Sequence, residues 1–232
     1  MEKKIADISH YDGVINWEEA RKELSFVIFR ASVGSNMDKK YLDNTRDCDL
    51  PYGAYHYVKA SNAEEAQQEA QWFVSCANKA LIKPLIYFAD IEYEAQTKTS
   101  TKEICAAFAA ELRKLGCKKI GIYIGQGKYP WAGTAITDYD CVWIPRYGKD
   151  TGEVPTEQYY PIYPCDLWQY TSKGKINGIN DDVDLNILHG DKPLEWFTNP
   201  LFDTLQKEDW VSKSIKKLFM LLVNWLKNIF IK

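Results

Sequence analysis

Short runs of β-branched and aromatic residues alternate along this chain with longer polar segments, and this alternation limits the possible folds more than any other feature. Eight runs have the length and composition of strands: 4–9, 26–32, 52–59, 85–92, 120–125, 141–147, 166–170 and 182–186. Helical periodicity separates several of the early runs, at 17–24, 63–80 and 102–115. Ser100 followed by Glu103 predicts a capping box at the start of the third helix. A strand, a helix and a further strand in succession indicate parallel βαβ units.

Eight strands with helices between the early ones predict a closed α/β barrel rather than an open sheet. At 232 residues the chain is short for such a barrel, which usually takes about 250. Residues 125–164 are rich in glycine, proline and aromatic residues and show no long helical period. We therefore expect an irregular TIM-like barrel with eight strands and few helices in its second half.

The charge distribution sets the last segment apart. Residues 1–209 hold 24 Lys+Arg and all 32 acids, whereas 210–232 hold five lysines and no acid. Large apolar residues recur in that segment at alternating intervals of four and three, which predicts one broad apolar helix face: Val211, Ile215, Leu218, Leu222, Trp225 and Ile229. We expect a barrel domain over 1–196, a linker over 197–209 and a basic amphipathic C-terminal helix over 210–232. Such a helix could pack on the barrel, self-associate, or bind a membrane or an anionic polymer.

The overall composition excludes several classes of function. With 29 Lys+Arg against 32 Asp+Glu, the net charge is −3, so there is no basic field to hold nucleic acid. The longest apolar run, 104–110, is too short to span a bilayer. The first residues reach Asp7 before any apolar region develops, which argues against a signal peptide and predicts synthesis in the cytoplasm.

Cysteine and histidine spacing argues against disulfides and metal sites. The six cysteines are widely and irregularly spaced, and we expect them to be free thiols. The three histidines, His10, His56 and His189, lack the spacing of a zinc site, so no metal and no other cofactor is expected. His56 lies between two tyrosines and is interpreted as a structural histidine rather than a base.

The most informative segment is 84–92, an apolar strand that ends in Asp90 and Glu92. Their spacing places both side chains on one face of the strand, and we expect that face to lie at the carboxyl-end mouth of the barrel. Two close carboxyl groups compete for charge, so one of them should have a raised pKa and act as a general acid. The alternative is that these acids are caps, turn residues or solvated strand ends.

Two further acids lie on the first and last predicted strands. Asp7 ends the first strand and Asp184 lies on the last, and barrel closure makes these strands neighbours. Asp182 would share a face with Asp184, so periodicity alone cannot say which of the two enters the site. Four converging acids, with neither a phosphate loop nor histidine ligands, favour glycoside hydrolysis.

Aromatic residues near the predicted strand ends could stack on sugar rings: Tyr55, Tyr57, Tyr123, Trp143, Tyr147, Trp168 and Tyr170. Taken singly, each is more often a core residue with a satisfied polar tip. From this set, together with one arginine in the second strand, we predict the substrate-binding residues Tyr55, Tyr123, Trp143, Trp168, Tyr170 and Arg30.

Seven motifs in order resemble those of the glycoside hydrolase family 25 lysozymes, the Chalaropsis-type muramidases, over roughly residues 4–190. They are Asp7-Ile-Ser9 with Gly13 and Trp17, Phe26-Val-Ile-Phe-Arg30-Ala-Ser with Gly34, Gly53-Ala-Tyr55-His56-Tyr57, Asp90-Ile-Glu92, Ile122-Tyr123, Trp168-Gln169-Tyr170 and Val183-Asp184-Leu-Asn186. The resemblance implies an irregular barrel that cleaves the β-1,4 bond between N-acetylmuramic acid and N-acetylglucosamine in peptidoglycan.

The resemblance also implies roles for particular residues. Glu92 takes the role of general acid, and Asp90 orients or stabilises the 2-acetamido group of the substrate. Asp7 and Asp184 line the site, and Tyr55 falls in a substrate-contacting segment. Hydrolysis is expected to retain configuration, with the acetamido oxygen as internal nucleophile.

Two other readings remain open, a non-catalytic wall-binding module and an enzyme acting on another polysaccharide such as chitin. A chain of this kind is expected to act on the bacterial cell wall after release, as a phage or prophage endolysin or as a lysozyme carried on a tail or injection device. Its tail could then meet an anionic wall polymer.

Overall fold

The computed structural model describes residues 3–202 and 204–205 of the 232-residue chain. The chain divides into two units, Met1–Thr198 and Asn199–Lys232. In the second unit the described residues make local hydrogen bonds, such as that from the Leu205 amide to the Leu201 carbonyl. The predicted helix over 210–232 lies outside the described residues, as do residues 203 and 206–209 of the predicted linker over 197–209.

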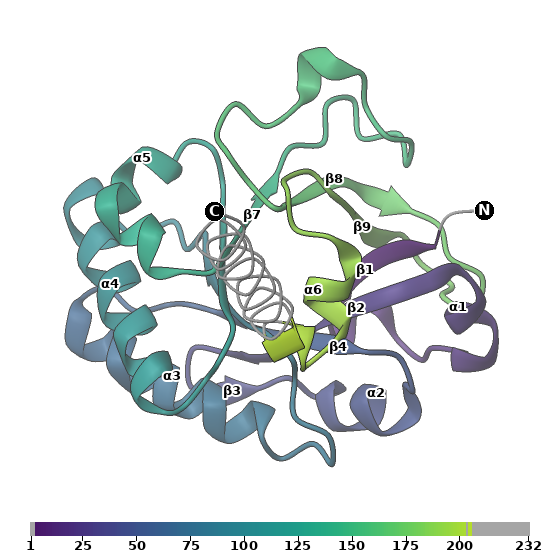
Figure 1. The fold of residues 1–232 in the computed structure, drawn as a ribbon, viewed down its shortest axis with the longest axis horizontal. Helices are drawn as coiled ribbons and strands as arrows, with labels where there is room; N and C mark the ends of the chain where they lie inside the picture. The colour runs from purple at the N-terminus through teal and green to yellow at the C-terminus, as the bar shows by residue number, and fades with distance from the viewer. Residues whose placement is uncertain (1–2, 203, 206–232) are drawn as a thin grey trace, which may run out of the picture. The chain divides into compact units, whose positions relative to one another are not determined.

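The first unit is a closed barrel of eight strands (Figure 1). The strands are β1 (Lys4–Ile8), β2 (Leu24–Val33), β4 (Tyr52–Tyr57), β5 (Tyr87–Ile91), β6 (Ile120–Ile124), β7 (Cys141–Pro145), β8 (Leu167–Gly174) and β9 (Val183–Leu188). Each coincides with one of the eight predicted runs, so the predicted fold class is confirmed. The sheet runs β1-β9-β8-β7-β6-β5-β4-β2, and pairing of β1 with β2 closes it. A two-residue strand, β3 (Asn36–Met37), adds to β2 outside the closed ring.

The last strand differs from the parallel arrangement expected from βαβ units. β9 runs antiparallel to both β1 and β8, while the other pairings within the ring are parallel. The connection between β8 and β9 is only 175–182. A parallel return needs a crossover of about a dozen residues or more, so this short connection imposes the antiparallel direction.

The three helices predicted within the barrel, at 17–24, 63–80 and 102–115, are confirmed, and shorter ones accompany them. The helices are α1 (Trp17–Glu23), α2 (Tyr41–Asp47), α3 (Ala63–Ala77), α4 (Lys98–Lys114), α5 (Tyr129–Ala132) and α6 (Leu194–Thr198), with 3-10 turns η1 (His10–Asp12), η2 (Gly133–Asp138) and η3 (Glu157–Tyr159). The start of α4 is corrected: Thr97 is the N-cap and forms the capping box with Ser100, one turn earlier than predicted. After α4, the described helices are all short, as expected for the second half.

Side chains alternate between two packed layers. Outward-facing strand residues pack with α3 and α4, around Phe73 and Phe108. The interior of the barrel holds large rings such as Phe88 and Trp143, whose centroids lie 5.4 Å apart. Gly121 makes room for them, because a Cβ there would lie 2.2 Å from Phe88 Cδ1.

The six cysteines are buried and free, as predicted. Burial raises the pKa of several of these thiols, that of Cys48 to about 12. Among the described residues, no helix is long and apolar enough to cross a membrane. The same residues contain no group of three or more His, Cys, Asp or Glu side chains arranged to hold a metal ion.

Candidate active site

A cavity of about 140 Å³ opens at the carboxyl ends of the parallel strands. Its lining consists of Asp7, Tyr55, Asp90, Glu92, Tyr123, Trp143, Tyr147, Gln169 and Asp184. All four predicted acids, Asp7, Asp90, Glu92 and Asp184, therefore meet in one place, and we refer to them as the four-acid cluster. The cavity is smaller than the roughly 300–1,000 Å³ of a drug-sized site, and its scale is that of a single sugar ring.

Strand register explains why the acids converge. Asp7 on β1 pairs directly with Asp184 on β9, and paired residues of antiparallel strands project to the same face. Asp90 on β5 pairs with Tyr123 on β6. Asp182 precedes the start of β9, is exposed and forms an ion pair with Lys175 at 2.6 Å. Of the two aspartates that periodicity left open, Asp184 therefore enters the site.

Asp7 is held by two side-chain amides whose orientation is fixed by their other partners. Gln169 Oε1 accepts hydrogen bonds from the hydroxyls of Tyr123 (2.8 Å) and Tyr147 (2.6 Å). Its Nε2 therefore faces Asp7 and donates to Oδ1 (3.0 Å) and Oδ2 (2.9 Å). Because an amide oxygen only accepts and its nitrogen only donates, this chain of contacts has a single consistent direction.

Asn186 repeats this arrangement on β9. The indole Nε1 of Trp143 donates to Asn186 Oδ1 at 2.7 Å, and Asn186 Nδ2 donates to Asp7 Oδ2 at 2.8 Å. The ring of Trp143 lies 4.6 Å from that of Tyr123 and 6.3 Å from that of Tyr55, near-perpendicular to both. The predicted residues Tyr55, Tyr123 and Trp143 thus line the cavity.

Every member of the four-acid cluster binds its proton more tightly than an ordinary carboxyl group. Burial raises the pKa of Asp7 to about 7, although its hydrogen bonds with Asn186 and Gln169 oppose this effect. Burial and the neighbouring acids raise the pKa of Asp184 to about 9 and that of Asp90 well above its usual value. Desolvation also raises the pKa of Glu92, which lies one residue beyond the end of β5. Such a cluster can donate protons near neutral pH.

Asp90 differs from Asp7 in its hydrogen bonding. Its Oδ1 atom is buried and has no hydrogen-bond partner among the described residues. A buried acceptor without a partner is costly, so an atom of this kind in a cavity wall indicates a place for a ligand donor.

Lys128 is a residue of the site that sequence reasoning missed. Its Nζ donates to the carbonyl of Tyr93, the residue after Glu92, and to Gln96 Oε1 at 3.2 Å. The amide of Gln96 in turn donates to the Val58 carbonyl at 3.0 Å, beyond the end of β4. Lys128 therefore ties down the loop behind Glu92, and its charge opposes the rise in the pKa of Glu92. A lone lysine in a glycine- and proline-rich segment gives no sequence signal for this role.

Gln169 and Asn186 were missed as well, although both lie inside the quoted motifs. A sequence signal for them exists. Each is a polar strand residue flanked by two aromatic or apolar residues, and if those neighbours face outward, the polar side chain faces the interior of the barrel.

Two predicted substrate-binding residues, Trp168 and Tyr170, lie elsewhere, and their expected place is corrected. Because Gln169 faces the cavity, its neighbours on β8 point to the other side of the sheet. Trp168 is fully buried, and its indole donates to the Arg146 carbonyl at 2.8 Å. Tyr170 lines a different cavity of about 820 Å³, which none of the four acids lines.

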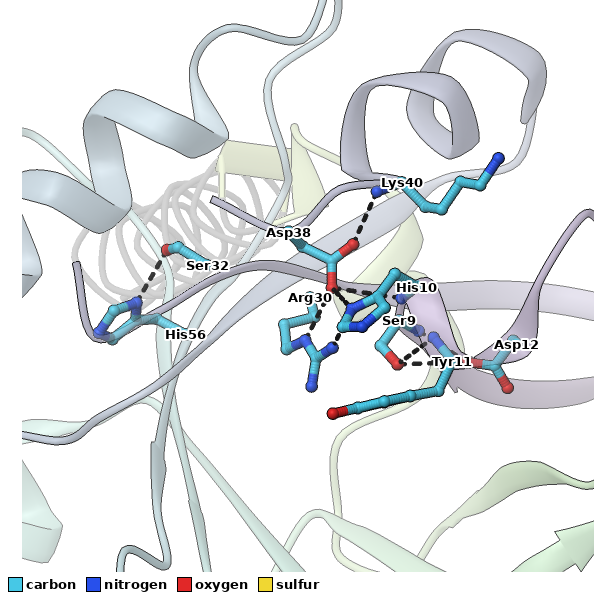
Figure 2. A network of polar contacts seen from close by, with 9 residues as sticks. All are labelled: Ser9, His10, Tyr11, Asp12, Arg30, Ser32, Asp38, Lys40 and His56. Carbon is cyan, nitrogen blue, oxygen red and sulfur yellow. Dashed lines mark hydrogen bonds and ion pairs between the residues drawn. The ribbon is translucent and has the colours of Figure 1, made fainter. Parts of the chain in front are cut away.

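Arg30 lies beside the cavity rather than in its lining. It pairs in register with Tyr55, but its Nε donates to Asp38 Oδ2 at 2.8 Å and its Nη2 lies 2.6 Å from His10 Nδ1 (Figure 2). Two of its three side-chain nitrogens thus meet protein partners, and direct binding of substrate by Arg30 stays a prediction.

His56 is confirmed as a structural histidine. Nδ1 lies 2.8 Å from Ser32 Oγ, a contact drawn in Figure 2, and Nε2 lies 2.8 Å from Glu69 Oε2. The residue is fully buried, and burial lowers its pKa.

Comparison with known proteins identifies a family. Residues 6–179 match the family described as glycosyl hydrolases family 25. Lysozyme M1 of Streptomyces globisporus is 25% identical over 207 residues, which cover 79% of this chain and 67% of that protein.

Solved structures are similar over most of the chain. GHIP, a glycosyl hydrolase 25 of Streptococcus pneumoniae, is 28% identical with a TM-score of 0.74, covering 84% of this chain and 92% of that one. The catalytic domain of endolysin ply40, from bacteriophage P40 of Listeria monocytogenes, is 29% identical with a TM-score of 0.72, covering 82% and 94%.

The raised pKa of Asp184 predicts a pH-dependent gain in stability for the Asp184→Asn variant. The pKa is about 9 in the folded protein against 3.8 as the ordinary value, so the folded state holds a proton that the unfolded state loses between these values. The free energy of unfolding of the parent therefore falls as pH rises through this range, and an amide removes that loss. We expect urea unfolding to show a gain of about 1–3 kcal/mol at pH 8 and a smaller gain at pH 5.

The matched control is Asp182→Asn, which changes an exposed aspartate two residues away. If the free energies of unfolding of Asp184→Asn and the parent differ by the same amount at pH 5 and at pH 8, the prediction is contradicted.

Proposed function

The chain belongs to glycosyl hydrolase family 25 and is a glycoside hydrolase acting as a lysozyme, and on that premise we propose the bond it cleaves and how. The family resemblance predicted from the sequence motifs is thereby confirmed. We propose hydrolysis of the β-1,4 bond between N-acetylmuramic acid and N-acetylglucosamine in peptidoglycan, with retention of configuration. The observation that carries the proposal is the four-acid cluster around a cavity on the scale of one sugar ring.

Glu92 is the general acid of this proposal. It lines the cavity from the end of β5, where its side chain stays accessible to the leaving oxygen of a bound glycan. Its raised pKa keeps a larger fraction protonated near neutral pH than an ordinary glutamate would have. Lys128 limits that rise, so the carboxylate formed by proton transfer is also tolerated.

Asp90 acts on the 2-acetamido group of the substrate. Its unpartnered Oδ1 would accept the acetamido N–H and turn the acetamido oxygen toward the anomeric carbon. That oxygen forms a bond to the anomeric carbon as the glycosidic bond breaks and Glu92 protonates the leaving oxygen. Water, deprotonated by Glu92, then opens the cyclic intermediate from the opposite face. Two displacements at one carbon restore its configuration.

The remaining lining residues shape this site. Asp184 adds a further carboxyl group to the cavity wall, and Asp7 is held in place by hydrogen bonds from Gln169 and Asn186. Tyr55, Tyr123 and Trp143 present aromatic surface beside the acids, where the apolar face of a sugar ring would pack.

We predict that Glu92→Gln abolishes lysis of purified cell walls while the fold stays intact. The amide keeps the shape of the side chain but has no proton to give to the leaving oxygen, and loss of a general acid commonly costs about 10²–10⁴ in rate. Turbidity of a wall suspension measures the loss, and circular dichroism checks the fold.

Glu94→Gln is the matched control, because Glu94 is exposed in the same loop and does not line the cavity. Lysis near the parent rate by a folded Glu92→Gln protein would sink the assignment of the acid. Chitin assayed beside peptidoglycan tests the substrate, and faster cleavage of chitin would contradict the proposed bond.

Retention predicts that the first-formed sugar product is the β-anomer. Proton NMR recorded within the first turnovers, before mutarotation, distinguishes the two anomers. An initial α-anomer would mean a single displacement by water between carboxyl groups about 6.5–9.5 Å apart, and would remove the role given to the acetamido oxygen.

We also propose that the chain acts on the bacterial cell wall after release. Its catalytic barrel would span 1–196 and a linker 197–209. The last segment, 210–232, would form a helix that binds an anionic surface, whether membrane or wall polymer. Five lysines without an acid in the last segment support an anionic partner.

Deletion of 210–232 should leave hydrolysis of soluble glycan fragments nearly unchanged and reduce lysis of intact cells. A full-length variant with the five lysines replaced by glutamine separates charge from apolar packing. If deletion unfolds the barrel or leaves intact-cell lysis unchanged, the surface-binding role is wrong. If the deletion instead converts an oligomer to a monomer and the lysine variant lyses cells normally, the role of 210–232 is self-association rather than surface binding.

A further inference from the structure

Tyr11 is an exposed aromatic residue held in a fixed position at the mouth of the barrel. It lies four residues beyond Asp7, in the turn η1 that follows β1, and 76% of it is accessible to solvent. Its backbone amide donates to Ser9 Oγ at 3.2 Å, and Ser9 is the N-cap of this turn. The turn therefore fixes the backbone of a residue whose ring has no place in the core.

One face of the Tyr11 ring is supported by two other groups. The Arg30 guanidinium carbon lies 5.0 Å from the ring centroid, and the His10 ring lies 4.1 Å away at an angle of 32°. Both lie on the same side of the ring in Figure 2. Because the residue is mostly exposed, its opposite face is open to solvent.

The supporting groups are themselves fixed by a buried carboxylate. Asp38, whose side chain is 1% exposed, accepts from Arg30 Nε, from the His10 amide (3.2 Å) and from the Lys40 amide (2.9 Å). These contacts lower the pKa of Asp38, so its charge persists and holds the guanidinium. We call Tyr11 with His10, Arg30 and Asp38 the Tyr11 platform.

The platform adjoins the cavity. Arg30 pairs in register with Tyr55, which lines the cavity wall, and its charge acts on both Tyr55 and Tyr11. Arg30 thus interacts both with the exposed ring and with a tyrosine of the cavity wall. The cavity has the scale of one sugar ring, so the rest of a polymeric substrate must lie on the surface around it.

We propose that Tyr11 is a stacking surface for a sugar ring of the glycan strand, at a position outside the cavity. This rests on the proposed function, since the occupant is a further unit of the same polymer. The open face of the ring packs on the apolar face of a pyranose, and the buried ion pair holds the ring in its binding position before substrate arrives. A surface that is already ordered loses little conformational entropy on binding.

The test compares Tyr11→Ala with Tyr11→Trp on peptide-free glycan strands of two lengths, long polymer and the shortest oligosaccharide the enzyme cleaves. An aromatic contact is worth about 0.5–1.5 kcal/mol, so Tyr11→Ala should raise KM on long strands roughly two- to tenfold. Because the contact is made equally in ground and transition states, kcat should not change. Short substrates should be cleaved at the parent rate, and Tyr11→Trp should restore the KM on long strands.

Leu81→Ala is the control for loss of an exposed apolar side chain. Leu81 is 93% exposed and lies between α3 and β5, a connection that enters β5 at the end opposite the mouth. Its KM on long strands should equal that of the parent. Thermal unfolding of each variant should match the parent, since none of the changed side chains is buried.

Binding measured in the Glu92→Gln background provides a readout independent of turnover. Tyr11→Ala in that background should weaken calorimetric binding of long peptide-free strands by the same factor as it raises KM. Unchanged KM and unchanged binding overturn the stacking role, as does an equal loss on short and long substrates. An effect seen only with strands that carry stem peptides also overturns it. A parent enzyme that cleaves no glycan would instead contradict the proposed function.

Discussion

The pairing of β1 with both β2 and β9 closes the barrel, and the arrangement of the site depends on that closure. Asp7 comes from the first strand and Asp184 from the last, and only the closed ring places them opposite one another. Asp90 and Glu92 then reach the same cavity from β5, across the mouth. Because this closure involves backbone hydrogen bonds along strands far apart in the sequence, the cluster cannot exist in a partly folded barrel.

Within the closed barrel, directional hydrogen bonds distinguish acids that would otherwise be equivalent. Asp7 accepts three hydrogen bonds from the amide nitrogens of Gln169 and Asn186, and both amides are oriented by aromatic donors on β6 and β7 or the loop beyond. Asp90 Oδ1 receives none. Asp7, whose two oxygens both have protein donors, is suited to a fixed electrostatic role. Asp90, whose Oδ1 has no partner among the described residues, is suited to accept a hydrogen bond from a substrate. The aromatic residues therefore do more than present surface, since they orient the amides that hold Asp7.

The barrel and the four-acid cluster could be predicted from the sequence because both depend on the periodicity of side chains along strands and helices. Strand alternation alone places Asp90 and Glu92 together, and the order of strands adds Asp7. The same period could not separate Asp182 from Asp184, because the choice depends on where β9 begins. Trp168 and Tyr170 were predicted to bind substrate because they are aromatic, whereas Gln169 between them is the residue that faces the cavity. The partners of Arg30 come from a loop after β3 and a turn after β1, and nothing local in the sequence joins them.

The six thiols of the barrel have a consequence for the conditions in which it can exist. All are buried and unpaired, and the protein around them raises the pKa of groups such as Cys48 and Cys165 to about 12. A protonated, enclosed thiol is a poor partner for disulfide exchange. The folded barrel therefore needs no oxidant to form and gains no cross-link afterwards. The same covalent structure persists when such a molecule passes from reducing to oxidising surroundings.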